Sequence, residues 1–131
     1  MKFFTWASAL SGSSAVILGA MGAHVLKERL TSAGNLEAWK TASLYHIVHA
    51  VALFAVLIAA QHANAQGDTK AVQAWRRVAI IWLVGVIFFS GSIYALSLGG
   101  PSWLGPVTPL GGILLIAGWV LIVRTRTPAG S

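Results

Sequence analysis

The fold is decided by an uncharged, mostly apolar stretch at residues 78–98, VAIIWLVGVIFFSGSIYALSL. An α-helix rises about 1.5 Å per residue, so about 20 apolar residues are needed to cross about 30 Å of hydrocarbon. The stretch therefore predicts a transmembrane helix. Gly99, Gly100 and Pro101 follow it directly and are expected to end the helix, because glycine and proline continue one poorly.

Three further apolar runs lie at residues 4–25, 41–61 and 108–123, the last of them short. Of the 131 residues, 56% are hydrophobic and 9% are charged, and the mean hydropathy is +0.76. So few charges cannot cover the surface of a soluble domain. We therefore predict one all-α membrane domain, residues 1–131, with four transmembrane helices in an antiparallel bundle. The first run also resembles a cleavable signal peptide, but its length and the lack of a clean cleavage site favour a retained helix.

The basic residues lie singly or in pairs at the edges of the apolar runs, so the formal charge of +6 predicts membrane anchoring and not nucleic-acid binding. With the N-terminus in the cytoplasm, three basic residues lie outside: Lys27, Arg29 and Lys40. The remaining six lie inside: Lys2, Lys70, Arg76, Arg77, Arg124 and Arg126. This excess predicts that both termini are cytoplasmic. Five tryptophans fall near the predicted boundaries as interfacial anchors: Trp6, Trp75 and Trp119 inside, Trp39 and Trp103 outside.

Small residues follow one face of the first run at helical spacing, which lets another helix approach closely. They are Ser8, Ser11, Gly12, Ala15, Gly19, Gly22 and Ala23. We predict that this stripe packs within the bundle, and we predict the same role for Gly91, Gly111 and Gly112. On the second run, the bulky side chains should face lipid and the histidines should face protein. The bulky set is Leu44, Ile47, Val48, Val51, Phe54 and Ile58.

Polar residues from four runs converge on the predicted outer half of the membrane. They are His24, Tyr45, His46, His49, Ser90, Ser92, Tyr94 and Thr108. Polar groups at membrane depth are costly and mark either a site or a hydrogen-bonded network. A purely structural role is the alternative, because membrane serines bond their own helix carbonyls and tyrosines anchor at interfaces.

His46 and His49 share a helix face, and His24 from another helix is the candidate that could complete a metal or haem site with His49. The chain has no cysteine, which excludes thiolate ligands and cysteine nucleophiles. Glu28, Glu37 and Asp68 fall in predicted loops, so a carboxylate-rich metal site or an acid/base pair is poorly supported. We assign no catalytic residue, and the sequence identifies no cofactor.

Four ordered motifs carry a resemblance to a known family. They are Gly19-Ala20-Met21-Gly22-Ala23-His24, Trp39-Lys40-Thr41-Ala42 with Tyr45 and His49, Phe89-Ser90-Gly91-Ser92-Ile93-Tyr94, and Thr108-Pro109-Leu110-Gly111-Gly112 with Gly118-Trp119. The chain resembles the DUF423 family, small bacterial inner-membrane proteins related to human transmembrane protein 256. The resemblance implies a four-helix membrane protein of no established biochemical activity. The motif residues it carries over are His24, Tyr45, His49, Ser90, Gly91, Ser92, Tyr94, Thr108, Pro109 and Gly111. His46 departs from the family, whose members commonly have glutamine there.

Three functions remain open. The first is a non-enzymatic accessory or scaffold protein of the bacterial inner membrane, whose polar cluster binds a partner, a lipid or a small amphiphile. The second is a haem-, metal- or quinone-binding redox subunit that uses His24 and His49. The third is a subunit of an oligomeric transporter or channel, which is least supported because no charge lies within the apolar runs to select ions. The expected partners are membrane lipid and a membrane protein or a second copy of the chain.

Overall fold

The structure is a computed structural model that describes residues 1–125, in which every regular element is helical. The elements are α1 (Lys2–Ala23), α2 (Lys27–Ser32), α3 (Leu36–Ala65), α4 (Thr69–Val86), the π-helix η1 (Ile87–Gly91), α5 (Ser92–Ser97), the 3₁₀-helix η2 (Ser102–Leu104) and α6 (Val107–Thr125). Arg126, one of the basic residues assigned to the inner side, lies outside the described residues.

Four helical segments are long and apolar enough to cross a membrane: Lys2–Ala23, Leu36–Ala65, Thr69–Ser97 and Ser102–Thr125. This confirms an all-helical chain with four candidate spans. The second and third segments begin several residues before the apolar runs at 41–61 and 78–98. Their polar first turns explain the difference, because a helix can continue beyond the hydrocarbon into water.

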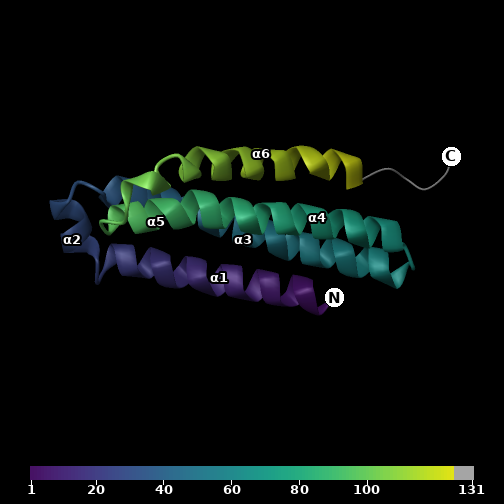
Figure 1. Cartoon of the computed structure of the whole chain (residues 1–131). Coiled ribbons are helices and arrows are strands. Elements are labelled where there is room, and N and C mark those ends of the chain that lie inside the picture. Colours follow the sequence, from purple (N-terminus) through teal and green to yellow (C-terminus); the bar gives the residue numbers. More distant parts are fainter. Residues whose placement is uncertain (126–131) are drawn as a thin grey trace.

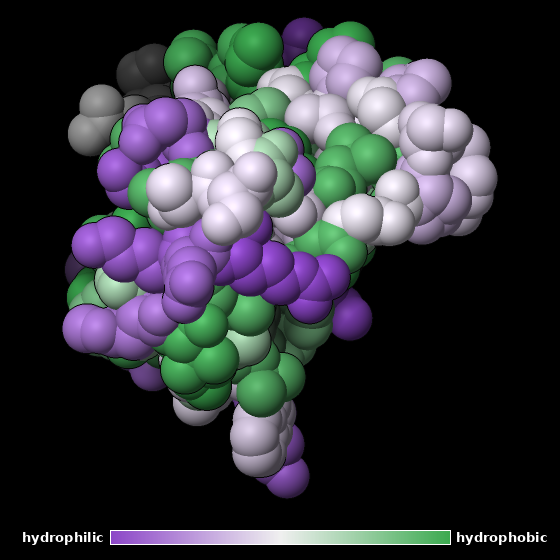
Figure 2. All heavy atoms as spheres, turned by 90° about the vertical axis from the view of Figure 1, so that its left-hand side faces the viewer, coloured by the Kyte–Doolittle hydropathy of each residue, from purple (hydrophilic) through white to green (hydrophobic). Residues whose placement is uncertain are grey.

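The helices lie side by side, with α3 and α4 between α1 and α6 (Figure 1). α1 packs against α3, α3 against α4, and α6 against α4 and η1. The N-terminus and the end of α6 lie at one end of the molecule, and α2 lies at the other (Figure 1). Figure 2 looks onto the α2 end and shows hydrophilic side chains gathered there.

The two faces predicted for the second run are confirmed in α3. All six bulky side chains of the outward face are exposed, whereas His46 and His49 are only 6% and 4% exposed. Tyr45, expected on the histidine face, is 43% exposed and packs against the ring of Phe89 at a centroid distance of 4.7 Å. Because a membrane supplies no water for the core to exclude, close packing holds such helices together.

Glycines provide the closest helix approaches. A Cβ at Gly22 would overlap the Trp39 indole, and a Cβ at Gly111 would overlap the backbone of η1. Gly12, Gly19 and Gly91 have no atom within 4 Å of such a Cβ, so the expectation that they pack closely is wrong. The remaining predicted packing residues differ among themselves: Ser11 and Ala15 are buried, Ser8 is half-buried, Ala23 is exposed and does not pack as predicted, and Gly112 makes ordinary contact with the Phe89 ring.

Two close approaches were not predicted from the sequence. A Cβ at Gly85 would meet the Leu115 side chain at 2.7 Å, and a Cβ at Gly118 would overlap the Trp82 indole. Both glycines lie in the contact between α4 and α6. They explain why α6 approaches α4 closely, as Gly111 explains its close approach to η1.

The third span is not one regular α-helix, because η1 interrupts it at residues 87–91. A π-helical turn inserts extra backbone into an α-helix and is frequent at functional sites. Apolar periodicity does not reveal it. Ser90, Tyr94 and Ser97 nevertheless share a buried face, with exposures of 0%, 7% and 6%.

Two sequence-based placements need correction. Trp39 is 1% exposed and its indole N–H donates to the Leu18 carbonyl oxygen at 2.9 Å, so it is a packing residue and not a lipid-facing anchor; Trp6 and Trp103 are exposed as expected. Glu28 lies on α2 and not in a loop, and Glu37 lies in the first turn of α3, before the apolar run begins. Acidic side chains are favoured in the first turn of a helix. They lower the hydropathy of that turn, so a hydropathy profile assigns it to a loop.

Candidate functional site

A chain of polar side chains crosses from α1 through α3 to α5. Ser14 Oγ lies 3.3 Å from His46 Nε2, and His46 Nδ1 lies 3.3 Å from the Tyr94 hydroxyl oxygen. The Tyr94 hydroxyl donates to Ser43 Oγ at 3.4 Å. These bonds are long, near the upper limit of hydrogen-bond distance. His46 is therefore held by two weak partners rather than locked in place.

Ser90 joins η1 to α3. Its hydroxyl donates to the Ala42 carbonyl oxygen at 2.8 Å, and its side chain is fully buried. Inter-helix bonds of this kind are common in membrane proteins, where each contributes about 0.6 kcal/mol on average. For Ser90 this bond favours a structural role, the alternative to membership of a binding site.

Ser92 and Thr108 join α5 to α6. Their hydroxyl oxygens lie 2.6 Å apart, and Ser92 also lies 3.0 Å from the Phe89 carbonyl oxygen, to which it can donate. The Ser92–Thr108 pair is a second link between helices, separate from the His46 chain. Two predicted members of the polar cluster therefore meet each other and not the histidines.

His49 has a partner at each ring nitrogen. Nδ1 lies 2.7 Å from the Tyr45 carbonyl oxygen, and the Trp119 indole N–H donates to Nε2 at 3.1 Å. A carbonyl oxygen only accepts and an indole N–H only donates, so Nδ1 carries the proton and Nε2 offers its lone pair to Trp119. The rings of Trp82 and Trp119 flank His49 at centroid distances of 5.7 and 6.0 Å. His49 is saturated by protein groups, and Trp119 lies at the depth of His49 rather than at the inner boundary where it was predicted.

His24 does not join the other histidines. It is exposed, directly beyond the end of α1, close to Gly22, which lies against Trp39. His49 lies about 15 Å further along α3 than Trp39, at about 1.5 Å per residue. His24 and His49 are thus too far apart to bind one metal ion. Within residues 1–125, no three His, Asp or Glu side chains group closely enough to hold one.

His46 borders a cavity of about 280 Å³ between α1, α3 and the third span. Its lining combines polar and apolar residues: Leu10, Ser11, Ser14, His46, Leu83, Val86, Ile87, Ser90 and Gly91. Ser11 is 7% exposed, and its hydroxyl has no hydrogen-bond partner among the described residues. A buried hydroxyl without a partner is uncommon and calls for an explanation, such as an occupant of the neighbouring space.

Three members of this site, Ser11, Ser14 and Ser43, were not predicted as site residues from the sequence. Ser11 was assigned to the packing stripe, and Ser14 and Ser43 lie at positions that many membrane serines occupy without function. The available signal was their depth, since all three lie within runs predicted to be transmembrane. The depth of a residue in the membrane does not determine which neighbouring helix its side chain points toward.

We expect that His49→Phe, which keeps an aromatic ring but removes both nitrogens, lowers the free energy of unfolding by about 1 kcal/mol, because the Trp119 N–H loses its acceptor. We also expect no change in the visible absorption of protein purified from its native membrane, because both nitrogens already bond protein groups. Unfolding in increasing mole fractions of dodecyl sulfate and a reduced-minus-oxidised spectrum check the two parts. A haem band that disappears in the variant would contradict the structural role of His49.

Comparison with known proteins gives consistent matches. The family described as "Protein of unknown function (DUF423)" matches residues 18–112. A UPF0382 membrane protein of Staphylococcus saprophyticus is 38% identical over 125 residues, covering 94% of this chain and 95% of the relative. The UPF0382 membrane protein YwdK of Bacillus subtilis is 37% identical, covering 94% of each chain. A UPF0382 membrane protein of Schizosaccharomyces pombe is 34% identical, covering 88% of this chain and 94% of the relative. No solved structure matches the chain.

Proposed function

Because this chain belongs to the DUF423 family, whose matched relatives are named as membrane proteins, we propose that it is a non-enzymatic accessory protein that binds a small amphiphile in the cavity beside His46. The observation that carries the proposal is the Ser11 hydroxyl, which is buried at this cavity without a partner. The setting is a bacterial inner membrane, with the four helices antiparallel and both termini in the cytoplasm.

The distribution of charge supports this orientation. Six of the nine basic residues lie on the side of the membrane where the predicted topology places the N-terminus. In membrane proteins the cytoplasmic loops carry the excess of lysine and arginine. In Figure 1 the N-terminus and the end of α6 lie at the same end of the molecule, opposite α2. The cavity is lined by Ser11 and Ser14 from the middle of α1 and by Ser90 of η1, so in this orientation it lies near the middle of the membrane.

The chemistry of the cavity supports an amphiphile. Ser11 offers a hydroxyl donor, so a carbonyl, ether or hydroxyl oxygen on the ligand would satisfy it. Leu10, Leu83 and Ile87 provide apolar contacts beside it. A volume of about 280 Å³ is at the small end for ligand pockets, which fits a polar head with a short apolar part. No charged side chain lines the cavity, so an uncharged head is favoured.

A non-enzymatic role is supported by the distance of the three carboxylates from the cavity, which leaves His46 without an acidic partner. The acidic residues are remote from it: Glu28 and Glu37 are near the α2 end, and Asp68 caps α4 by accepting from the Ala71 N–H at 2.9 Å. The accessory role is supported by the outer helices. Only 22% of the residues in the most apolar part of α1, and 17% of those in the most apolar part of the last span, are buried. The two helices therefore keep faces for lipid or for another membrane protein.

We expect that Ser11→Ala leaves the free energy of unfolding unchanged, because no hydrogen bond is lost, and lowers the amount of co-purifying amphiphile roughly fivefold, as for one lost hydrogen bond of about 1 kcal/mol. His46→Leu should also lower the amount, because it replaces the imidazole that lines the cavity with a branched apolar side chain. The measurement is mass spectrometry of the compounds extracted from protein purified in mild detergent from its native membrane.

The matched control is Ser13→Ala, on the same helix. Ser13 is exposed, donates to the Ala9 carbonyl oxygen at 2.7 Å and does not line the cavity. Equal amounts of the same compounds in the wild type and in all three variants would rule out the site. Conversion of the bound compound by the purified protein would overturn the non-enzymatic part.

A further inference from the structure

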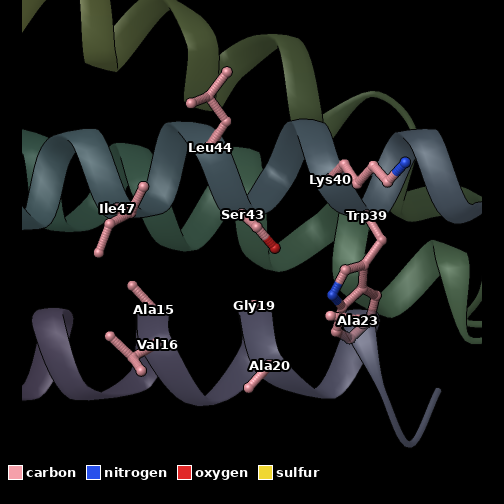
Figure 3. Close-up of a pocket in the computed structure, with 11 residues that line it drawn as sticks. Ala15, Val16, Gly19, Ala20, Ala23, Trp39, Lys40, Ser43, Leu44 and Ile47 are labelled. Carbon is pink, nitrogen blue, oxygen red and sulfur yellow. The ribbon is translucent and has the colours of Figure 1, made fainter. Parts of the chain in front are cut away.

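A second opening lies between α1 and α3 and shares no residue with the cavity beside His46. It is an apolar groove of about 630 Å³. Figure 3 shows the α3 side chains of Ile47, Ser43 and Trp39 directed toward α1, across from Ala15 and Gly19. The groove therefore runs along the two helices rather than into the bundle.

Gly19 forms the floor of the groove. No atom lies within 4 Å of the position that a Cβ on Gly19 would take, whereas one turn later the Trp39 indole fills the space at Gly22. Trp39 thus closes the groove toward the α2 end. The predicted small-residue stripe packs against α3 at Ala15 and Gly22 but leaves open space between them.

The polar groups of the groove occur in a fixed order along α3. Lys40 comes first at the α2 end, Ser43 follows about 4.5 Å further along the helix, and the rest of the lining is apolar apart from the Trp39 indole. Ser43 Oγ accepts from Tyr94, and the Ser43 hydroxyl hydrogen has no acceptor within residues 1–125. Lys40 Nζ bonds Glu37 at 2.7 Å and keeps further N–H donors, since an ammonium group has three.

We propose that this groove binds one acyl chain of a glycerophospholipid, with an ester carbonyl on the Ser43 hydroxyl and the phosphate at Lys40. A cation, then a hydroxyl donor, then apolar side chains match the phosphate, ester and acyl chain of such a lipid in order. The Lys40 ammonium also supplies the charge that a phosphate requires. An apolar helix of a partner would offer no anion to Lys40.

The test is native mass spectrometry of the full chain in mild detergent with added dioleoylphosphatidylglycerol. We expect one retained lipid per wild-type chain. Gly19→Leu fills the groove floor and should weaken retention about tenfold or more. Lys40→Gln should weaken retention about fivefold, the ratio that corresponds to about 1 kcal/mol per surface lysine, and should leave retention of dioleoylglycerol, which lacks the phosphate, unchanged.

The matched control is Gly12→Leu. Gly12 is on the same helix and also has open space around its Cβ position, but it does not line the groove. Circular dichroism checks that both leucine variants remain folded. Equal loss in both variants, or full retention in Gly19→Leu, overturns the proposal. A wild-type dimer that Gly19→Leu abolishes while lipid retention persists would assign the groove to a second copy and also overturn it.

Discussion

Gly111→Ala is expected to lower the free energy of unfolding by about 3 kcal/mol, at the upper end of the cost of overpacking a tight contact. A Cβ at Gly111 would overlap Phe88 and Phe89 at backbone atoms of η1. Backbone cannot rotate aside as a flexible side chain can, so α6 must move away from the third span. That shift would also stretch the 2.6 Å contact between Ser92 and Thr108.

Gly112→Ala provides the matched comparison. The atoms nearest to its Cβ position belong to the Phe89 ring at 3.7 and 3.9 Å, which is ordinary contact. Alanine also favours the helix over glycine by about 1 kcal/mol, so Gly112→Ala should be neutral or slightly stabilising. Both variants are measured by unfolding in mixed micelles of rising dodecyl sulfate content. Similar stability of the two variants would show that α6 does not sit on η1 as described.

Trp39→Ala is expected to cost about 3 kcal/mol, at the lower end for tryptophan truncation. The unfolded reference in a membrane is itself partly apolar, so lost packing dominates over lost transfer energy. Trp39 is 1% exposed, packs against the Tyr94 ring at a centroid distance of 4.6 Å and donates to the Leu18 carbonyl oxygen. Its removal would leave a cavity where Gly22 of α1 packs against α3.

Trp103→Ala is the control, because Trp103 is 68% exposed. We expect a change within about 0.5 kcal/mol, as for surface substitutions in general. Trp39→Phe should fall between the two variants, since it keeps most of the packing and loses the bond to Leu18. If Trp39→Ala unfolds at the same dodecyl sulfate content as Trp103→Ala, Trp39 is an interfacial anchor and the packing of α1 on α3 is wrong.

The faces of α3 could be predicted because they depend only on helical periodicity. Val51 and Phe54 fall on one side and His46 and His49 on the other in any α-helix, and the exposures agree. Tyr45 is the exception. It lies near the boundary between the two faces, where the position of the neighbouring Phe89 decides its exposure.

The membership of the polar site could not be predicted in the same way. Depth placed His24, His49 and Tyr94 in one layer, yet His24 is exposed at the α2 end and His49 pairs with Trp119. Tyr94 reaches His46 instead. Ser90 itself lies in the π-helix η1, whose extra backbone shifts the register of the span, and nothing in the apolar pattern indicates this turn.

The amino-acid sequence by itself determined that the helices lie in lipid, how many candidate spans there are, and which faces of α3 point inward and outward. Length, hydropathy and a 3.6-residue period are local properties of a chain. The tertiary structure alone decided which polar groups meet. Ser11 beside His46, Trp119 on His49 and the open floor at Gly19 each depend on the rotation and separation of two helices. Those quantities are set by close packing between residues far apart in the chain, and no local pattern encodes them.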